Sequence, residues 1–273
     1  MPYPDRQEII NKIYERNRAR VLDSQNSFAI NRLEFLKFPA HSTALYIISR
    51  VPNPDTVVLY TYGGITPHHF YTDHLTKMVR DQTSGKNPQF TWEWIDHWLD
   101  QNVAIAILDF PTYFIANGLG WVSSFYRLTD DRRRESLLAL DILADMFPSA
   151  TLNWFGISYG ALDAANISQV ESPLRKIISS SSNWHRVPHL DSYHQGGRLD
   201  NYDVSTSKKP VLIVMHEKEV FEKAQEQMQK TDSILVANDI SKEDGHFFRD
   251  RQKEVVTAMC DWLRDKPIPK IIP

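Results

Sequence analysis

The stretch Gly156-Ile157-Ser158-Tyr159-Gly160 decides how this chain folds. An apolar run, Thr151 to Phe155, precedes it, and a helix-like segment from Ala161 to Val170 follows it. A serine on a sharp turn from strand to helix projects its hydroxyl from the backbone, and glycine at both flanking positions lets the neighbouring chain pass closely. The pattern therefore predicts a strand, a tight turn that exposes Ser158, and a helix.

The composition is that of one large α/β domain. A chain of 273 residues can bury a core that needs no disulfide or metal. The formal net charge is −3, with acidic and basic residues interspersed, so we expect no nucleic-acid partner. The single cysteine, Cys260, leaves no pair for an internal disulfide, and its amphipathic surroundings predict a core thiol. No membrane-spanning or targeting pattern is present, so we expect a cytoplasmic protein that does not bind membranes.

Strand-like and helix-like segments alternate along most of the chain. This alternation predicts a mostly parallel central sheet with helices on both faces. Ahead of it, Arg32–Phe38 and Ala44–Val51 have the spacing of a hairpin and predict N-terminal antiparallel edge strands, and Arg132–Phe147 has the period of a crossover helix. The predicted strands of the parallel part are Thr56–Thr61, Val103–Leu108, Leu152–Phe155, Lys176–Ser180, Val211–Met215 and Ile234–Ala237.

We expect residues 1–273 to form a single domain, because no repeat or flexible linker divides them. Residues 1–30 predict a charged, amphipathic helical extension. Residues 183–209 are polar and aromatic and too few for a lid domain, so they predict a short cap segment. A site under so small a cap favours small, soluble substrates.

The order of strands, the serine motif and a histidine near the C-terminus together resemble the α/β-hydrolase fold family, over about Arg32 to Leu263. The resemblance implies an acid shortly after the strand Val211–Met215, where Glu219 matches the acid's position and Glu217 is the alternative. It also implies a histidine in the loop before the last helix, which His246 matches. The chain order of serine, acid and histidine is that of this fold.

The resemblance implies a role for each of these residues. His246 would take the proton of Ser158 as the hydroxyl attacks a carbonyl, and Glu219 would orient the imidazole and stabilise its charged form. The oxyanion hole would be formed by the backbone N–H of Tyr159 and by that of Gly64, with Ile65 as the next choice. The chain departs from the family pattern at Tyr62, where many members carry histidine, at His216, which replaces a usual small residue, and in its glutamate acid.

Ten histidines raise the question of a metal site. Their spacing contains no HExxH pattern and no cysteine ligand pair, so we expect no metal and place them in polar loops near the pocket. Trp94 and Trp98 are spaced to share one helical face, which favours core packing over a pocket wall. The clustered histidines are His68, His69, His74, His185, His189 and His194.

The sequence as a whole predicts a serine hydrolase that cleaves a small carboxylic ester or thioester through an acyl-enzyme. Its partner would be a small-molecule acyl substrate, and it would need no cofactor. Amide cleavage and acyl transfer use the same residues and stay open as alternatives. A protein of another class, a non-catalytic binding protein that keeps the fold and pocket, is the further alternative.

Overall fold

The structure is a computed structural model that describes residues 28–38, 42–61, 92–111, 129–157, 160–180, 207–215, 232–236, 248 and 251–272. Within these ranges all strands belong to one sheet of nine, in the order β1-β2-β4-β3-β5-β6-β7-β8-β9. No helix in the described part of the chain is long and apolar enough to cross a membrane. The strands are β1 (Ile30–Lys37), β2 (Ser42–Ser49), β3 (Thr56–Thr61), β4 (Val103–Pro111), β5 (Thr151–Ile157), β6 (Leu174–Ser180), β7 (Val211–Met215), β8 (Asp232–Val236) and β9 (Ile271–Ile272).

The sheet is mostly parallel, as the sequence predicts. β1 and β2 form an antiparallel hairpin at one edge, and β2 pairs antiparallel with β4. Each remaining neighbouring pair of strands, from β4 through β3 to β9, is parallel. Consequently the carboxyl ends of β3, β5, β6, β7 and β8 lie along one edge of the sheet, where a parallel α/β sheet places its ligand site.

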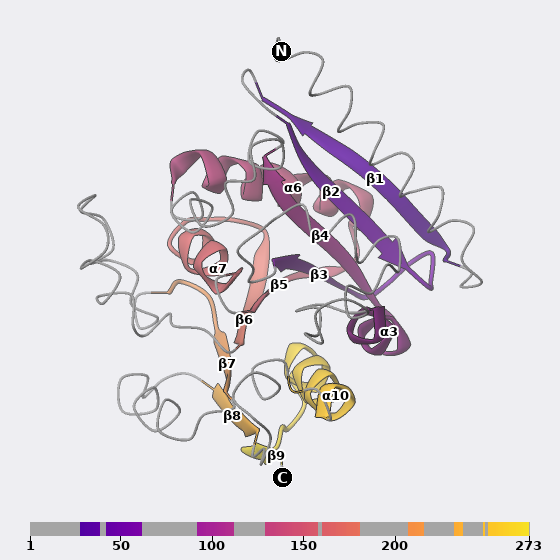
Figure 1. The fold of residues 1–273 in the computed structure, drawn as a ribbon, viewed down its shortest axis with the longest axis vertical. Coiled ribbons are helices and arrows are strands. Elements are labelled where there is room, and N and C mark those ends of the chain that lie inside the picture. The colour runs from indigo at the N-terminus through magenta and orange to yellow at the C-terminus, as the bar shows by residue number, and fades with distance from the viewer. Residues whose placement is uncertain are drawn as a thin grey trace, which may run out of the picture.

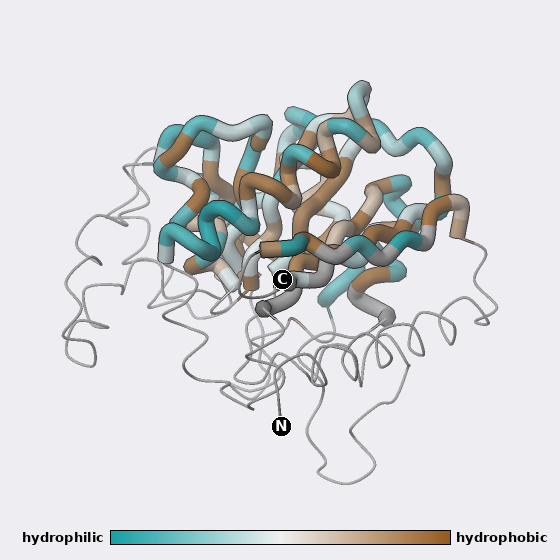
Figure 2. Tube along the Cα trace, turned by 90° about the horizontal axis from the view of Figure 1, so that it is seen from above, coloured by the Kyte–Doolittle hydropathy of each residue, from teal (hydrophilic) through white to brown (hydrophobic). Residues whose placement is uncertain are grey.

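Helices cover both faces of this sheet (Figure 1). On one face lie α6 (Asp130–Met146) and α7 (Ala161–Ser168), and on the other lie α3 (Trp92–Asp100) and α10 (Gln252–Leu263). Each pair of helices covers its own core cluster, which we call the α6/α7 core and the α3/α10 core. Hydrophobic stretches run through the interior of the described chain, and hydrophilic ones lie mainly toward its periphery (Figure 2). The strands are thus buried on both faces, which explains their continuous apolar runs.

The element boundaries follow the predicted ones closely. β3 and β7 have the predicted bounds, while β5 continues to Ile157, directly before the serine of the motif. α6 begins earlier than predicted because the Thr129 side chain caps it, accepting a hydrogen bond from the Arg132 N–H at 3.2 Å. β9, a short strand after the last helix, is the one described element that the sequence analysis did not predict.

Two predicted core residues are confirmed. Trp98 is 1% exposed and packs its ring against Phe155, with centroids 5.4 Å apart. Cys260 is also 1% exposed, in the α3/α10 core. Burial raises the pKa of this thiol to about 12, so Cys260 is a packing residue rather than a nucleophile.

Candidate active site

The serine motif lies between a central strand and a helix, as predicted. β5 ends at Ile157, and α7 begins at Ala161, directly after Gly160. Of the three residues between the strand and the helix, Ser158 and Tyr159 lie outside the described residues. The chain therefore turns from the middle of the sheet into a helix on its face within a very short segment, which is the arrangement that the motif requires.

Gly156 shows how tight this turn is. A Cβ atom at this position would lie 2.6 Å from the carbonyl oxygen of Gly160 and 2.8 Å from both the N and Cα atoms of Ala161. These are backbone atoms, so they cannot move aside as the end of a flexible side chain could. The last residues of β5 and the first turn of α7 are thus in direct contact, and only glycine fits between them.

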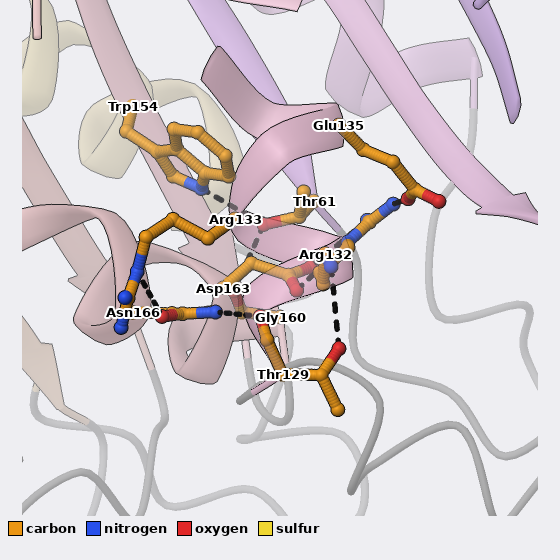
Figure 3. A network of polar contacts seen from close by, with 9 residues as sticks. All are labelled: Thr61, Thr129, Arg132, Arg133, Glu135, Trp154, Gly160, Asp163 and Asn166. Atoms are coloured by element: carbon orange, nitrogen blue, oxygen red, sulfur yellow. Dashed lines mark hydrogen bonds and ion pairs between the residues drawn. The ribbon is translucent and has the colours of Figure 1, made fainter. Parts of the chain in front are cut away.

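A buried pair of hydrogen bonds ties this turn to the neighbouring strand (Figure 3). The Thr61 hydroxyl donates to the carbonyl oxygen of Gly160 at 2.8 Å and accepts from the indole N–H of Trp154 at 2.9 Å. Thr61 is the last residue of β3, and the predicted oxyanion loop with Gly64 begins directly after it. The structure therefore fixes the end of the strand that leads to Gly64 against the turn that contains Ser158.

The register of the sheet relates the serine to the two candidate acids. Ile157 pairs with Ser180 on β6, and Ser180 pairs with Val214 on β7, so the three residues form one row across the sheet. Strands two apart are separated by about 10 Å. A third group, such as an imidazole, would bridge the serine and the acid.

The chain close to the predicted histidine is anchored in the core. Phe248, two residues after His246, is fully buried and belongs to the same α3/α10 core as Ile157 and Val214. Its φ angle is 52°, in the left-handed region that phenylalanine rarely adopts. Its carbonyl accepts a hydrogen bond from the Arg251 N–H at 2.7 Å, just before α10. Such a constrained backbone is typical of segments that hold a functional residue in place.

The predicted site residues themselves lie outside the described residues. This applies to Ser158, Tyr159 and Gly64 at the turn and the oxyanion loop, and to His246 and both candidate acids, Glu219 and Glu217. The clustered histidines and the cap segment 183–209, except its last residues, lie outside them as well. The structure describes the elements around these residues, which we call the frame: the strand ends, the start of α7, and the contacts of Thr61 and Phe248.

A buried ionic cluster beside the turn was missed by the sequence analysis. Arg132 on α6 is bound by Asp163 on α7 and by Glu135 one turn further along α6, and all three side chains are fully buried. The sequence analysis assigned no role to the charged residues at the start of α6, Asp130 to Glu135. The sequence feature that could have revealed the cluster lies in α7. Asp163 is the one charged residue of this helix, whose eight residues are all buried. A carboxylate in such a helix requires a buried partner.

No family model matches this chain, and no curated protein matches it.

Solved structures, in contrast, match most of its length. A 2,6-dihydroxy-pseudo-oxynicotine hydrolase is 14% identical with a TM-score of 0.56, covering 88% of this chain and 70% of that one. A dienelactone hydrolase from Anabaena variabilis is 13% identical with a TM-score of 0.56, covering 87% and 98%. An esterase from Pyrococcus furiosus is 12% identical with a TM-score of 0.56, covering 87% and 93%. The likeness shows that the chain has the α/β-hydrolase fold.

Proposed function

We propose that this chain, which has the α/β-hydrolase fold, is a serine hydrolase that cleaves a small carboxylic ester or thioester. The observation that carries the proposal is the contact of Gly156 with Gly160 and Ala161. It shows that the two ends of the turn around Ser158 lie against each other at the carboxyl edge of the sheet, where this fold has its nucleophile. The names of the similar structures, two hydrolases and an esterase, support the same class of reaction.

In the proposed first half-reaction, the Ser158 hydroxyl oxygen attacks the carbonyl carbon of the substrate while His246 takes its proton. The negative charge that develops on the carbonyl oxygen is met by the backbone N–H groups of Tyr159 and Gly64. The tetrahedral intermediate then collapses, the bond to the alkoxide or thiolate breaks, and His246 returns the proton to this leaving group. Ser158 remains as its acyl ester.

The second half-reaction uses the same groups. His246 takes a proton from water, the resulting hydroxide attacks the acyl carbon, and the bond to the Ser158 oxygen breaks as that oxygen regains a proton. In both halves Glu219 stabilises the imidazolium and keeps the imidazole in the required tautomer. The anchored Thr61 supports the proposed oxyanion hole, because it ties the strand before Gly64 to the carbonyl of Gly160.

The proposal is tested by fluorophosphonate labelling, which reports an activated serine without knowledge of the substrate. Wild type and Ser158→Ala are compared by intact mass and then by hydrolysis of p-nitrophenyl acetate and its thioester analogue. We expect labelling and turnover in wild type and neither in Ser158→Ala, at equal melting temperatures. A second serine variant at an exposed site, Ser149→Ala, is the control and should label like wild type. If folded wild type does not label, the proposal is wrong and the protein is a binding protein with this fold.

A further inference from the structure

The buried cluster of Arg132, Asp163 and Glu135 joins α6 to the helix that follows Ser158 (Figure 3). The Arg132 guanidinium binds both oxygens of Asp163, with Nε to Oδ1 at 3.0 Å and Nη2 to Oδ2 at 3.1 Å. Its Nη1 binds Glu135 Oε2 at 3.0 Å. Two parallel hydrogen bonds between planar groups fix orientation as well as distance.

Stability alone does not account for such a cluster. Burial lowers the pKa of Arg132, but the charges of Asp163 and Glu135 outweigh this effect and raise it, so the group stays cationic. Removing several charges from water is costly, and well-packed apolar residues of similar volume often serve stability equally well. The feature that apolar residues cannot reproduce is the directional fork between Arg132 and Asp163. The cluster is therefore best explained by the geometry that it enforces.

The element that it fixes is the first turn of α7. Asp163 is the third residue of this helix, five positions after Ser158. The helix has no side-chain cap at Gly160, and three of its eight buried residues are alanines, Ala161, Ala164 and Ala165. Small side chains form shallow ridges that resist sliding poorly. Polar contacts with α6 therefore add to the packing of Leu162 and Ile167 in setting the position of the helix along the sheet.

Two further contacts complete this anchoring. Arg133 Nε donates to Asn166 Oδ1 at 2.9 Å, and Asn166 Nδ2 donates to the carbonyl of Thr129 at 2.9 Å. They repeat the link between α6 and α7 one turn beyond Asp163. Directly before α7, the Thr61 hydroxyl donates a hydrogen bond to the Gly160 carbonyl. The start of the helix that follows Ser158 is thus held by β3 through Gly160 and by α6 through Asp163 and Asn166.

We propose that Arg132 and Asp163 are positioning residues, whose buried fork sets the place of α7 and with it the alignment of the Ser158 hydroxyl and the Tyr159 N–H for acyl transfer. The proposal rests on the proposed function. Both side chains are fully buried, so the proposed role involves no contact with the substrate. Their effect is on the reacting geometry, because a displacement of about 1 Å at a nucleophile can cost about 100-fold in rate.

The test separates positioning from folding. The triple variant Arg132→Met/Glu135→Leu/Asp163→Leu removes the fork but leaves no buried charge unpaired, and Arg132→Lys keeps the charge without the fork. For each we measure the melting temperature, the second-order rate of fluorophosphonate labelling, and kcat and KM for p-nitrophenyl acetate. We expect both variants to unfold cooperatively, which shows that they are folded. Their labelling rate and kcat should be about tenfold or more below those of wild type. KM should stay within about threefold, since the loss is in the transition state.

Two controls make the result specific. Arg134→Met removes an exposed cation from the same helix and should leave every rate unchanged. Lys176→Met removes a buried cation near the amino end of β6, away from the serine, and should lower the melting temperature but not the labelling rate. The proposal would be overturned if the folded triple variant labels at the wild-type rate. If the triple variant does not fold, the same result for folded Arg132→Lys would overturn it. Absence of labelling in wild type would instead disprove the proposed function.

Discussion

Gly156 and Gly160 approach so closely that a Cβ atom on the first would lie 2.6 Å from the carbonyl oxygen of the second. Because the obstructing atoms belong to the backbone, Gly156→Ala must push α7 away from β5. We expect a loss of about 1–3 kcal/mol in the free energy of unfolding, as for other overpacked sites. Fluorophosphonate labelling should fall further than stability does, because the displaced helix follows Ser158 directly.

Denaturant unfolding and labelling of Gly156→Ala check this prediction. The control is Ala150→Gly, a change of the same size just before β5, where the side chain is half-buried. A Gly156→Ala protein with wild-type stability and labelling would mean that the strand and the helix do not meet as closely as described.

The Thr61 hydroxyl supports a second prediction. Thr61→Val keeps the shape of the side chain but leaves the Gly160 carbonyl and the Trp154 N–H without this partner in a buried place. Each unsatisfied group costs about 1–3 kcal/mol, so the melting temperature of Thr61→Val should be clearly below that of wild type. Thr61→Ser keeps the hydroxyl and should have a melting temperature close to that of wild type. Thr257→Val is the matched control, since the Thr257 hydroxyl bonds to the Lys253 carbonyl where water can replace it. Equal melting temperatures for Thr61→Val and Thr257→Val would contradict the prediction.

Much of this frame is predictable from sequence. Apolar runs bounded by turn residues located β3 and β7 with their observed bounds, and the glycine pair around Ser158 indicated the close contact that Gly156 makes. These features are local, because a buried strand must be continuously apolar and a tight turn must be free of side chains.

The features that sequence did not predict depend on contacts between distant segments. Arg132 looks like part of a solvated charged turn until α6 and α7 are packed together, when it becomes fully buried against Asp163. The same holds for Thr61, whose hydroxyl bonds to Gly160, a residue 99 positions away. β9 has two residues and is recognisable only through its pairing with β8. Local patterns carry no information about such pairings.

The only cysteine of the chain provides a further prediction. Burial raises the pKa of Cys260 from its ordinary value of 9.0 to about 12, so the folded thiol stays protonated at pH 8 and reacts poorly. An aromatic disulfide reagent at pH 8 should modify no thiol in the native protein and one thiol in denaturant. Since the unfolded thiol ionises near pH 9, stability should also decline between about pH 9 and 12. Rapid modification of the native protein would contradict the burial of this residue.

Asp265 links the end of α10 to β6 through ion pairs with Arg175 and Lys176. We therefore expect the stability of the protein to depend on pH in the acidic range. A hydrogen bond from Lys176, followed by one from Arg175, lowers the pKa of this carboxyl from its usual 3.8. The carboxylate therefore stabilises the fold above pH 3.8, and this contribution is lost as the pH falls through the lowered pKa. Asn tolerates the positive φ of 59° at this position, so Asp265→Asn removes the charge alone.

The melting temperature of Asp265→Asn should be below that of wild type at pH 7 and should converge with it as both are acidified below about pH 4. Asp141→Asn, which removes an exposed carboxylate from α6, is the control. A difference between Asp265→Asn and wild type that stays constant down to pH 2 would show that the carboxylate charge is not responsible.

The identity of the triad acid gives the last prediction. Met215 ends β7, so Glu217 and Glu219 follow the same strand at the edge of the sheet where β5 leads to Ser158. In the proposed mechanism the acid acts on Ser158 through the imidazole of His246. Glu219→Gln should therefore lower kcat by orders of magnitude, because the imidazolium loses its counter-charge and tautomer control, while substrate binding is little changed. Glu217→Gln serves as its matched control and should keep wild-type turnover of p-nitrophenyl acetate. The reverse outcome would assign the acid to Glu217, and full activity in both variants would mean that the carboxylate comes from another part of the chain.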